Sequence, residues 1–308
     1  MDSSTVELSV IIVNWNTREH LAQCLRSLEH NVRMPALPTA EVLVVDNAST
    51  DGSVEMVQQQ FPWARLIENS TNVGFARANN RAIQESQGRY VVLLNSDTEV
   101  HSGALETMIE FLEEHSMVAA CGPRLLNADG SLQPSCHPVL TPGREFWRLM
   151  FLDRIWRRAT YAQHRWDPAT PRRVEVIKGA CLLLRRKALD QVGLLDEQYF
   201  MYTEEMDLCY RMMQAGWELW WVPQAVVAHY GEASTRQVAE EMYVQLYRSK
   251  AQFHRKFGGG RRAAHFARLV AFAYWPRWAI ARLMAPLWPD LAVRAQTFRR
   301  LLAELPTM

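Results

Sequence analysis

Residues 90–99 read Tyr90-Val91-Val92-Leu93-Leu94-Asn95-Ser96-Asp97-Thr98-Glu99, an apolar run that leads directly into a polar cluster. An uninterrupted run of β-branched and leucine residues is typical of a strand buried on both faces of a parallel α/β sheet. Ligands of such sheets bind beyond the carboxyl ends of the strands. Asp97 therefore lies where a ligand is expected, and its carboxylate could hold a hard divalent cation. Alternatively, Asn95, Ser96 and Asp97 only form a turn that caps the following helix.

Predicted strands and helices alternate on both sides of this segment. Apolar runs predict strands at 8–13, 41–46 and 64–68, and helical patterns occupy 18–28, 53–61, 75–86 and 103–115. This alternation indicates an α/β fold with a mostly parallel central sheet and helices on both faces.

The pattern changes in the second half of the chain. An Asp129-Gly130 pair predicts a hairpin, and an irregular, basic, tryptophan-containing segment follows it. The remaining predicted elements are strands at 174–184, 217–221 and 225–229, a helix at 204–215, and a helical segment from about residue 238 to the end. Gly258-Gly259-Gly260 predicts a break in that last segment.

The charge of the chain is unevenly distributed. Its formal net charge is only +1 over 308 residues, yet the part from Arg255 onward carries ten basic and two acidic residues. A basic tail on a mildly acidic body suggests an anionic surface, membrane or nucleic acid, as partner. Five scattered cysteines without a C-x-x-C pair favour a reducing compartment over a disulfide framework or zinc site. We expect no signal peptide, and residues 269–288 are too often interrupted by arginine and proline for a membrane span.

Polar clusters follow three of the predicted strands and should meet at one edge of the sheet. Asp46 could accept a hydrogen bond from a uracil or thymine imide, and Trp15 offers a face on which a base could stack. Gly74 at a helix entry, followed by Arg77, could contact a diphosphate. Each feature also has a purely structural interpretation, as a capped turn or a helix start. The chain lacks the G-x-G-x-x-G and P-loop motifs, which disfavours a dinucleotide-binding dehydrogenase and a P-loop NTPase.

The order of these motifs resembles the inverting family 2 glycosyltransferases, and most closely their bacterial rhamnosyltransferase-like branch. The resemblance rests on Ser9-Val10-Ile11-Ile12-Val13-Asn14-Trp15-Asn16, Val45-Asp46-Asn47-Ala48-Ser49-Thr50-Asp51-Gly52-Ser53, Asn72-Val73-Gly74-Phe75 and Leu93-Leu94-Asn95-Ser96-Asp97-Thr98. It implies a GT-A fold, a nucleotide-sugar donor and a divalent cation, Mg²⁺ or Mn²⁺. The nucleotide-sugar-binding residues that it implies are Val13, Asn14, Trp15, Asn16, Asp46, Asn47, Asn72, Gly74, Phe75, Arg77, Asn79, Asn95, Ser96 and Asp97.

The resemblance also implies a metal site and an acceptor side. The family's D-x-D motif appears as Asn95-Ser96-Asp97, so the metal role passes to Asp97 alone, with His229 as a second ligand. The segment Phe200 to Arg211 resembles the family's acidic pair at a helix start, which implies Glu205 as the catalytic base. The family usually has Asp at that position. Glu204 and Asp207 are supporting catalytic candidates, and Lys178, Gly179 and Ala180 are expected to line the acceptor side.

Purely structural roles remain open for these residues. Acidic residues in a first helical turn offset the helix dipole, and Asp207 with Arg211 has the spacing of an ordinary i,i+4 pair. A lone histidine near a strand end, such as His229, is commonly a core residue.

The sequence predicts two parts, a GT-A catalytic domain at 1–240 and a C-terminal helical segment at 241–308. Within the first, residues 1–122 form the donor half and residues 123–240 the acceptor half. The basic, aromatic-rich second part suits helices lying in a membrane interface. A homodimer interface or a cap on the catalytic domain is the alternative. We expect a membrane partner rather than nucleic acid.

We therefore interpret the chain as a metal-dependent inverting glycosyltransferase. The resemblance suggests L-rhamnose from dTDP-rhamnose as donor and a hydroxyl of a lipid-linked or polysaccharide glycan as acceptor, in cell-envelope biosynthesis. It suggests a cytoplasmic protein peripheral to the inner face of the cell membrane. Two alternatives stay open: another donor such as UDP-galactofuranose or UDP-GlcNAc, and a non-catalytic scaffold that binds sugar nucleotides or membranes.

Overall fold

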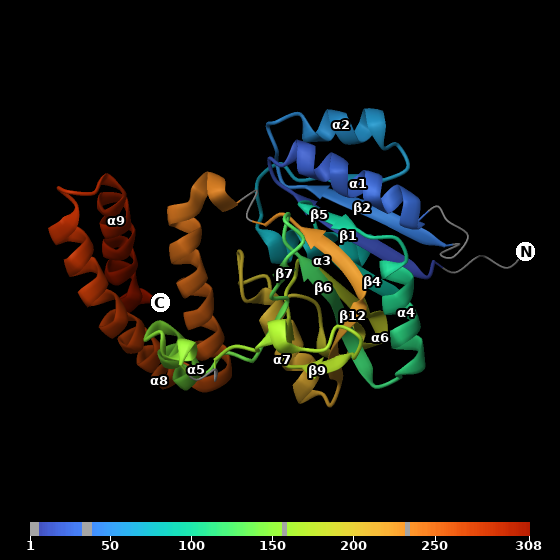
Figure 1. Cartoon of the computed structure of the whole chain (residues 1–308). Coiled ribbons are helices and arrows are strands. Elements are labelled where there is room, and N and C mark those ends of the chain that lie inside the picture. The colour runs from blue at the N-terminus through green and yellow to red at the C-terminus, as the bar shows by residue number, and fades with distance from the viewer. Residues whose placement is uncertain (1–5, 33–38, 156–158, 232–234) are drawn as a thin grey trace, which may run out of the picture. The chain divides into compact units, whose positions relative to one another are not determined.

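A computed structural model describes residues 6–32, 39–155, 159–231 and 235–308 (Figure 1). The chain divides into two compact units. The first unit contains the chain up to residue 137 together with 162–200 and 204–237, and the second contains 138–161, 201–203 and 238–308. The last segment of the second unit begins at Val238, whereas the sequence analysis places the boundary after residue 240. The second unit also includes residues 138–161, which the sequence analysis assigned to the acceptor half.

The first unit is built around a mixed, mostly parallel sheet. The strands are β1 (Leu8–Asn14), β2 (Ala40–Asp46), β3 (Arg65–Glu68), β4 (Tyr90–Asn95), β5 (Thr98–Val100), β6 (Val118–Leu126), β7 (Leu132–Gln133), β8 (Cys136–His137), β9 (Arg172–Val174), β10 (Val176–Ile177), β11 (Cys181–Arg185) and β12 (Glu218–His229). The order in the sheet is β3-β2-β1-β4-β11-β6-β12-β5, with β7 beside β6 and β9 beside β12. β1 pairs in parallel with both β2 and β4, whereas β11 runs antiparallel between β4 and β6. β8 and β10 form a separate antiparallel pair.

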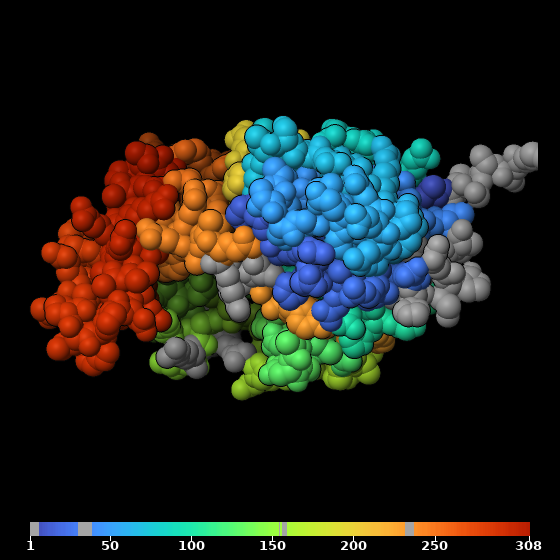
Figure 2. All heavy atoms as spheres, turned by 90° about the horizontal axis from the view of Figure 1, so that it is seen from above, coloured from blue at the N-terminus to red at the C-terminus, as the bar shows by residue number. Residues whose placement is uncertain are grey.

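Helices cover both faces of this sheet. They are α1 (Arg18–Val32), α2 (Ser53–Gln60), α3 (Phe75–Glu85), α4 (Ala104–Glu114), α6 (Arg186–Val192) and α7 (Glu204–Gln214), with short 3-10 turns at Gln163–Arg165 and Thr235–Val238. Alternate residues of β1, β2 and β4 share one buried core with α1, α2 and α4. The residues between them point to the opposite face, and α3 contacts β1 and β2. Figure 2 shows α1 and α2, in blue, on the outer surface of the first unit.

The apolar run that begins at Tyr90 is the central strand β4, and its side chains from Tyr90 to Leu94 are buried. Burial on both faces explains why this strand is apolar without alternation. The structure differs from the prediction at β12, which is one strand with a register shift between Val222 and Val226 rather than two strands. The run expected as one strand at 174–184 is divided among β9, β10 and β11.

The second unit is helical. It contains α5 (Pro142–Leu149), α8 (Ala239–Met284), α9 (Pro289–Glu304) and 3-10 turns at Leu152–Arg154 and Leu305–Thr307. The helix α5 lies in a segment that the sequence predicts to be irregular. α8 has a non-helical residue at Gly259, whose φ is 72°, so the break predicted at the three glycines is confirmed. Both halves of α8, α9 and the end of α5 share one core, which includes Leu149, Val244, Phe266, Val270 and Leu301.

Across the described residues, no helix is sufficiently long and apolar to span a membrane. The five cysteines are buried and free. Burial raises the pKa of Cys24, Cys136 and Cys209 to about 12, so these thiols stay protonated.

Candidate active site

The ends of β1 and β2 carry a buried cluster of polar side chains. Asn14 and Asp46 are register partners in the two strands, and the Asn14 amide donates to Asp46 Oδ1 (3.0 Å) and to Ser49 Oγ (3.1 Å). Asp46 Oδ2 accepts from the backbone N–H of Ser49 at 2.8 Å. These bonds fix the orientation of the Asp46 carboxylate, and each of its oxygens retains a lone pair for a further donor.

Two backbone positions beside this cluster have left-handed conformations. Asn16 has a φ of 51° and Ala48 a φ of 64°, which is an unusual conformation for residues other than glycine. The Asn16 side chain accepts from the backbone N–H of Thr50 at 2.7 Å, so it ties the end of β1 to the β2–α2 turn. Trp15 and Val13 are half-buried beside it.

Thr17 connects this cluster to β4, a role that the sequence analysis missed. Its hydroxyl donates to Asn14 Oδ1 at 2.7 Å and lies 2.8 Å from Ser96 Oγ. Because the single Thr17 proton is used by Asn14, Ser96 is the donor in the second bond. The polar ends of β1, β2 and β4 therefore form one network, as the sequence analysis expects for the carboxyl edge of parallel strands.

The segment before α3 is attached to the end of β2 through Asn47. The Asn47 amide donates to Asn72 Oδ1 (2.9 Å), and its oxygen accepts from the backbone N–H of Val73 (3.2 Å). Gly74 has a φ of 85°, and a Cβ at this position would lie 2.4 Å from the carbonyl oxygen of Phe200. The next residue, Phe75, donates its N–H to that same carbonyl at 2.7 Å. Only glycine fits this approach, which joins the donor half to the acceptor half.

Two of the expected nucleotide-sugar residues have partners within the protein. The guanidinium of Arg77 is exposed and pairs with Glu197 at 3.2 Å. The buried amide of Asn79 donates to the carbonyl of Phe75 in the same helix at 2.9 Å. A diphosphate contact by Arg77 would therefore require this exposed ion pair to open.

The two expected metal ligands lie side by side. Asp97 Oδ1 is 3.3 Å from His229 Nε2, and both side chains are largely buried. The Asn95 amide nitrogen also lies 3.3 Å from His229 Nε2. The backbone holds the two residues together, because the N–H of Tyr230 donates to the carbonyl of Asp97 at 2.9 Å.

Gln133, another residue that the sequence analysis missed, determines which nitrogen of His229 faces Asp97. The Gln133 amide nitrogen donates to Asn127 Oδ1 (2.8 Å) and to the carbonyl of His229 (3.1 Å), so its oxygen must be the atom 2.6 Å from His229 Nδ1. That oxygen can only accept, so Nδ1 carries the hydrogen. In the neutral ring, Nε2 then carries a lone pair, which lies 3.3 Å from both the Asn95 amide donor and the Asp97 carboxylate.

Two lone-pair donors that face each other at this distance suit a cation between them. The residues present therefore fit a divalent metal ion. Within the described part of the chain, no three or more His, Cys, Asp or Glu side chains gather as a metal site. The protein would thus supply two ligands, and phosphate oxygens and water would complete the coordination, as is common for Mg²⁺.

The expected acceptor side meets the start of α7. Ala180 accepts from the backbone N–H of Asn95 at 3.0 Å, so residues 178–180 adjoin the end of β4. A Cβ placed on Gly179 would lie 3.8 Å from both Glu205 Cβ and Phe75 Cε1. A methyl group at position 179 would therefore fit in van der Waals contact with the candidate base and with the residue that follows the Gly74 turn. The half-buried Lys178 precedes Gly179. The backbone N–H of Lys178 donates to the carbonyl of Ser135 at 2.8 Å.

The first turn of α7 contains two glutamates in different environments. Glu204 is buried, while Glu205 is only half-buried. Burial, and then the negative charge of Glu205, raise the pKa of Glu204 well above its ordinary value. Two adjacent carboxylates in a dry site do not both ionise readily, and the raised pKa of Glu204 favours its protonated form. The chain enters this turn through Tyr202 (φ 68°) and Thr203 (φ 74°), two consecutive non-glycine residues in a strained conformation.

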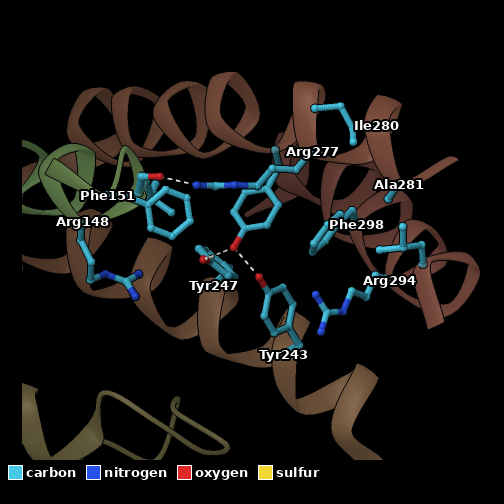
Figure 3. Close-up of a pocket in the computed structure, with 12 residues that line it drawn as sticks. Arg148, Phe151, Tyr243, Tyr247, Arg277, Ile280, Ala281, Arg294 and Phe298 are labelled. Atoms are coloured by element: carbon cyan, nitrogen blue, oxygen red, sulfur yellow. Dashed lines mark hydrogen bonds between the residues drawn. The ribbon is translucent and has the colours of Figure 1, made fainter. Parts of the chain in front are cut away.

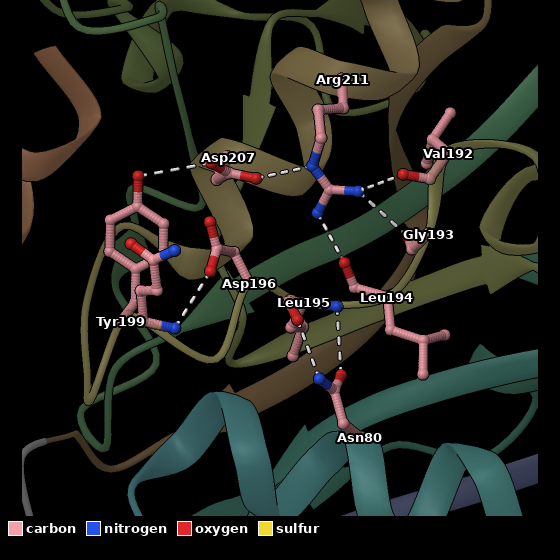
Figure 4. A network of polar contacts seen from close by, with 10 residues as sticks. Asn80, Val192, Gly193, Leu194, Leu195, Asp196, Tyr199, Asp207 and Arg211 are labelled. Atoms are coloured by element: carbon pink, nitrogen blue, oxygen red, sulfur yellow. Dashed lines mark hydrogen bonds and ion pairs between the residues drawn. The ribbon is translucent and has the colours of Figure 1, made fainter. Parts of the chain in front are cut away.

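Asp207, the third acid of this turn, is held in a network of polar contacts. The side chain is fully buried, pairs with Arg211 at 2.6 Å and accepts from the Tyr199 hydroxyl at 3.3 Å. Arg211 in turn donates to the carbonyls of Val192, Gly193 and Leu194 (Figure 4). The network holds the 192–199 loop against α7, and it is the i,i+4 pair that the sequence analysis left as the alternative.

A cavity of about 570 Å³ adjoins the β2–α2 turn. It is lined by Arg18, Ser49, Thr50 and neighbouring residues of α2, and none of the expected site residues lines it. The cavity lies beside the Asp46 turn rather than at Asp97 or Glu205.

Comparison with known proteins identifies the family. The model of glycosyl transferase family 2 matches residues 9–193. The chain belongs to this family. It is therefore a glycosyltransferase, and the matched range contains the clusters around Asn14, Asp46, Asp97 and Gly179.

Relatives and solved structures agree with this assignment. The family 2 chain is 34% identical over 250 residues to the N-acetylglucosaminyl-diphospho-decaprenol L-rhamnosyltransferase of Mycobacterium tuberculosis, which covers 74% of this chain and 77% of that protein. It is 27% identical over 214 residues to a low-salt glycan biosynthesis hexosyltransferase of Haloferax volcanii, and the match covers 67% of this chain and 61% of that protein.

Two solved structures share the fold at 18% identity. One is the mannosyltransferase of Pyrobaculum calidifontis in complex with GDP-Man and Mn²⁺, with a TM-score of 0.53 and coverage of 98% of this chain and 86% of that one. The other is GalNAc-T7 with UDP, GalNAc and Mn²⁺, with a TM-score of 0.53 and coverage of 74% and 44%. The first unit therefore has the GT-A fold, as the sequence predicts.

Proposed function

We propose that this family 2 enzyme is an inverting rhamnosyltransferase that transfers L-rhamnose from dTDP-rhamnose to a hydroxyl of a lipid-linked glycan. The observation that carries the proposal is the 34% identity to the mycobacterial enzyme, whose name specifies an L-rhamnosyl donor group and a polyprenyl diphosphate-linked acceptor. The acceptor would lie at the cytoplasmic face of the cell membrane, where the enzyme would be peripherally bound.

Glu205 is the base in this proposal. Its carboxylate takes the proton of the acceptor hydroxyl as that oxygen bonds to the anomeric carbon from the face opposite the leaving group. The bond from the anomeric carbon to the diphosphate oxygen breaks, and its electron pair leaves with the nucleotide diphosphate. Attack from the opposite face inverts the anomeric configuration. Support comes from Glu204, whose raised pKa favours its neutral form and so spares Glu205 an adjacent negative charge.

The remaining residues bind and orient the donor. Asp46, held by Asn14 and Ser49, would accept the imide N–H of the base, while Trp15 would provide a stacking face. A divalent cation held by Asp97 and His229 would offset the charge of the leaving diphosphate. Gly179 has no side chain beside Glu205, so an acceptor sugar could approach the backbone there.

The test is a donor panel with the full-length protein and a synthetic polyprenyl diphosphate-linked GlcNAc acceptor. We expect product from dTDP-rhamnose in the presence of Mg²⁺ or Mn²⁺ and none in excess EDTA, with the anomeric configuration read by NMR. Preference for UDP-galactofuranose or UDP-GlcNAc would overturn the donor assignment. Absence of turnover with every donor would favour the non-catalytic scaffold.

Variants at position 205 test the base. Glu205→Gln should lower kcat about 10²- to 10⁴-fold, the usual effect of removing a general base, and leave donor affinity near the wild-type value. Glu205→Asp, which restores the family's usual residue, should retain measurable turnover. Near-wild-type turnover of Glu205→Gln would assign the base to another residue.

A further inference from the structure

The second unit contains a cavity of about 490 Å³ that the transfer reaction does not use. It opens between the end of α5, both halves of α8 and the helix α9, and every residue that lines it belongs to the second unit (Figure 3). Its chemistry differs from that of the sheet edge, because its walls are cationic and aromatic.

Three arginines line the cavity, and within the described part of the chain no carboxylate does. Arg148 pairs with Glu145 behind the wall, and Arg277 donates to the carbonyl of Leu149 while its guanidinium lies 5.0 Å from the centre of the Tyr274 ring. Arg294 is exposed, and no hydrogen bond or ion pair among the described residues uses its guanidinium. The cavity thus carries net positive charge with at least one guanidinium available to an anion.

Three tyrosines add hydroxyl groups to the same wall. The Tyr247 and Tyr274 hydroxyl oxygens are 2.7 Å apart, and Tyr243 bonds to Tyr274 (Figure 3). Burial raises the pKa of all three hydroxyls, so they remain neutral. Two mutual hydrogen bonds use two of the three protons. The three hydroxyls therefore form one connected polar cluster on this wall.

The mouth of the cavity is apolar and exposed. Phe151 and Ile280 line it with exposed fractions of 54% and 58%. Seven of the eleven large hydrophobic side chains that are exposed among the described residues lie between 272 and 293, at the end of α8 and the start of α9. These seven are Phe272, Trp275, Ile280, Leu283, Leu287, Trp288 and Val293. Such a concentration marks an interaction surface rather than ordinary scatter.

We propose that this cavity binds the phosphate headgroup of an anionic phospholipid while the exposed apolar side chains at the end of α8 and the start of α9 enter the acyl region of the membrane. A phosphodiester matches guanidinium and hydroxyl donors, and the apolar rim matches what lies beside a headgroup in a bilayer but not beside a free phosphate in water. The proposal locates the membrane contact suggested above and is independent of the transfer chemistry, because it needs neither donor nor metal ion.

The test measures binding of the full-length protein to vesicles of phosphatidylcholine with and without phosphatidylglycerol, in EDTA and without nucleotide sugar. Arg294→Gln is compared with Arg299→Gln, an exposed arginine on the same helix that does not line the cavity. If surface charge attracts the protein only diffusely, both variants should lose vesicle affinity equally, by about 5-fold. If the cavity binds a headgroup, Arg294→Gln should lower vesicle affinity by about 10-fold or more, because a charge-assisted hydrogen bond to phosphate is also lost.

Two further measurements test the apolar contact and the headgroup separately. Ile280→Gln should weaken vesicle binding, while Met117→Gln, an equally exposed residue of the first unit, should not. Soluble dihexanoyl-phosphatidylglycerol should compete with the vesicles, and inorganic phosphate at the same concentration should not. Equal losses in both arginine variants, equal competition by phosphate, or a wild-type dimer that Ile280→Gln converts to a monomer without change in vesicle binding would overturn the assignment.

Discussion

Hydrogen-bond partners distinguish the acidic residues in the first turn of α7. Asp207 is surrounded by Arg211 and Tyr199, so its charge is already used to hold a loop in place. Glu204 is buried, and among the described residues it has no positive partner like that of Asp207, so burial keeps it protonated. Glu205 is only half-buried and lies beside Gly179. The local sequence predicts three acids in one turn, but only their surroundings tell them apart.

Replacement of Glu204 should change the pH dependence of stability. Its pKa is raised in the folded protein, so above about pH 4.5, its ordinary value, the folded chain keeps a proton that the unfolded chain has lost. Stability then falls as the pH rises through this window, at about 1.4 kcal/mol per pH unit at most. Glu204→Gln removes that slope and should be more stable than wild type at pH 8, with a smaller difference at pH 5.

Urea denaturation of the full-length protein at both pH values measures this effect. Glu241→Gln is the matched control, because Glu241 lies in the first turn of α8 but is exposed. The same slope in wild type and Glu204→Gln would show that Glu204 is ionised in the folded protein.

Gln133 should control metal affinity through His229. Gln133→Leu removes the acceptor of the His229 Nδ1 hydrogen, so the tautomer with Nε2 facing Asp97 loses its support. Loss of such a partner of a metal-ligating histidine typically lowers metal affinity about 10- to 100-fold. Mn²⁺ binding followed by electron paramagnetic resonance, with dTDP present and no turnover, measures the change. As a control, Asp129→Asn in the turn of the same hairpin should leave Mn²⁺ affinity unaltered. If Gln133→Leu binds Mn²⁺ with wild-type affinity, Gln133 does not support the metal site.

At the scale of elements, two glycines of the site differ in what they permit. Gly74 combines a positive φ with a backbone oxygen 2.4 Å from where a Cβ would lie, whereas the nearest atoms at Gly179 are 3.8 Å away. The turn before α3 therefore depends on its glycine, and the segment between β10 and β11 does not. In that segment, the small residue at position 179 keeps the region beside Glu205 free of a side chain.

The two positions should respond differently to alanine. Gly74→Ala should destabilise the protein by roughly 1–3 kcal/mol from backbone strain alone, with a further cost from the contact with Phe200. Gly179→Ala should leave the free energy of unfolding within about 1 kcal/mol of wild type, since its conformation is open to L-residues. Chemical denaturation of both variants provides the comparison. Equal effects would mean that the Phe200 carbonyl can move aside without cost.

At the scale of the whole molecule, the C-terminal residues complete a core rather than forming a detachable tail. Phe266, Val270 and Leu301 share buried contacts with Leu149 and Val244, which precede Arg255 in the chain. The basic charge of this part is carried on the outside of a folded unit. Removal of everything from Arg255 onward would therefore expose an apolar helix face along with any loss of membrane binding.

A truncation before Arg255 should bind the hydrophobic dye ANS and aggregate, because half of that core is missing. Point variants avoid this problem. Leu301→Ala should cost about 2–5 kcal/mol, the usual effect of a cavity at a fully buried leucine, while Val293→Ala, exposed on the same helix, should cost little. Thermal unfolding of the full-length variants tests the difference. A soluble truncation without dye binding would show that the first half of α8 is stable alone.

The alternation of strands and helices in the first 115 residues, the α/β class and the break at the three glycines could be predicted from the sequence, because they follow from local apolar periodicity and turn residues. So could the convergence of Asn14, Asp46 and Asp97, since the carboxyl ends of parallel strands share one edge. Contacts between distant parts of the chain could not be predicted in this way. Gln133 reaches His229 across 96 residues, Phe200 imposes a glycine at position 74, and α5 joins α8 and α9 in one core. Such pairings depend on which surfaces meet once the chain has folded. Local sequence patterns do not predict contacts with residues so far away in the chain.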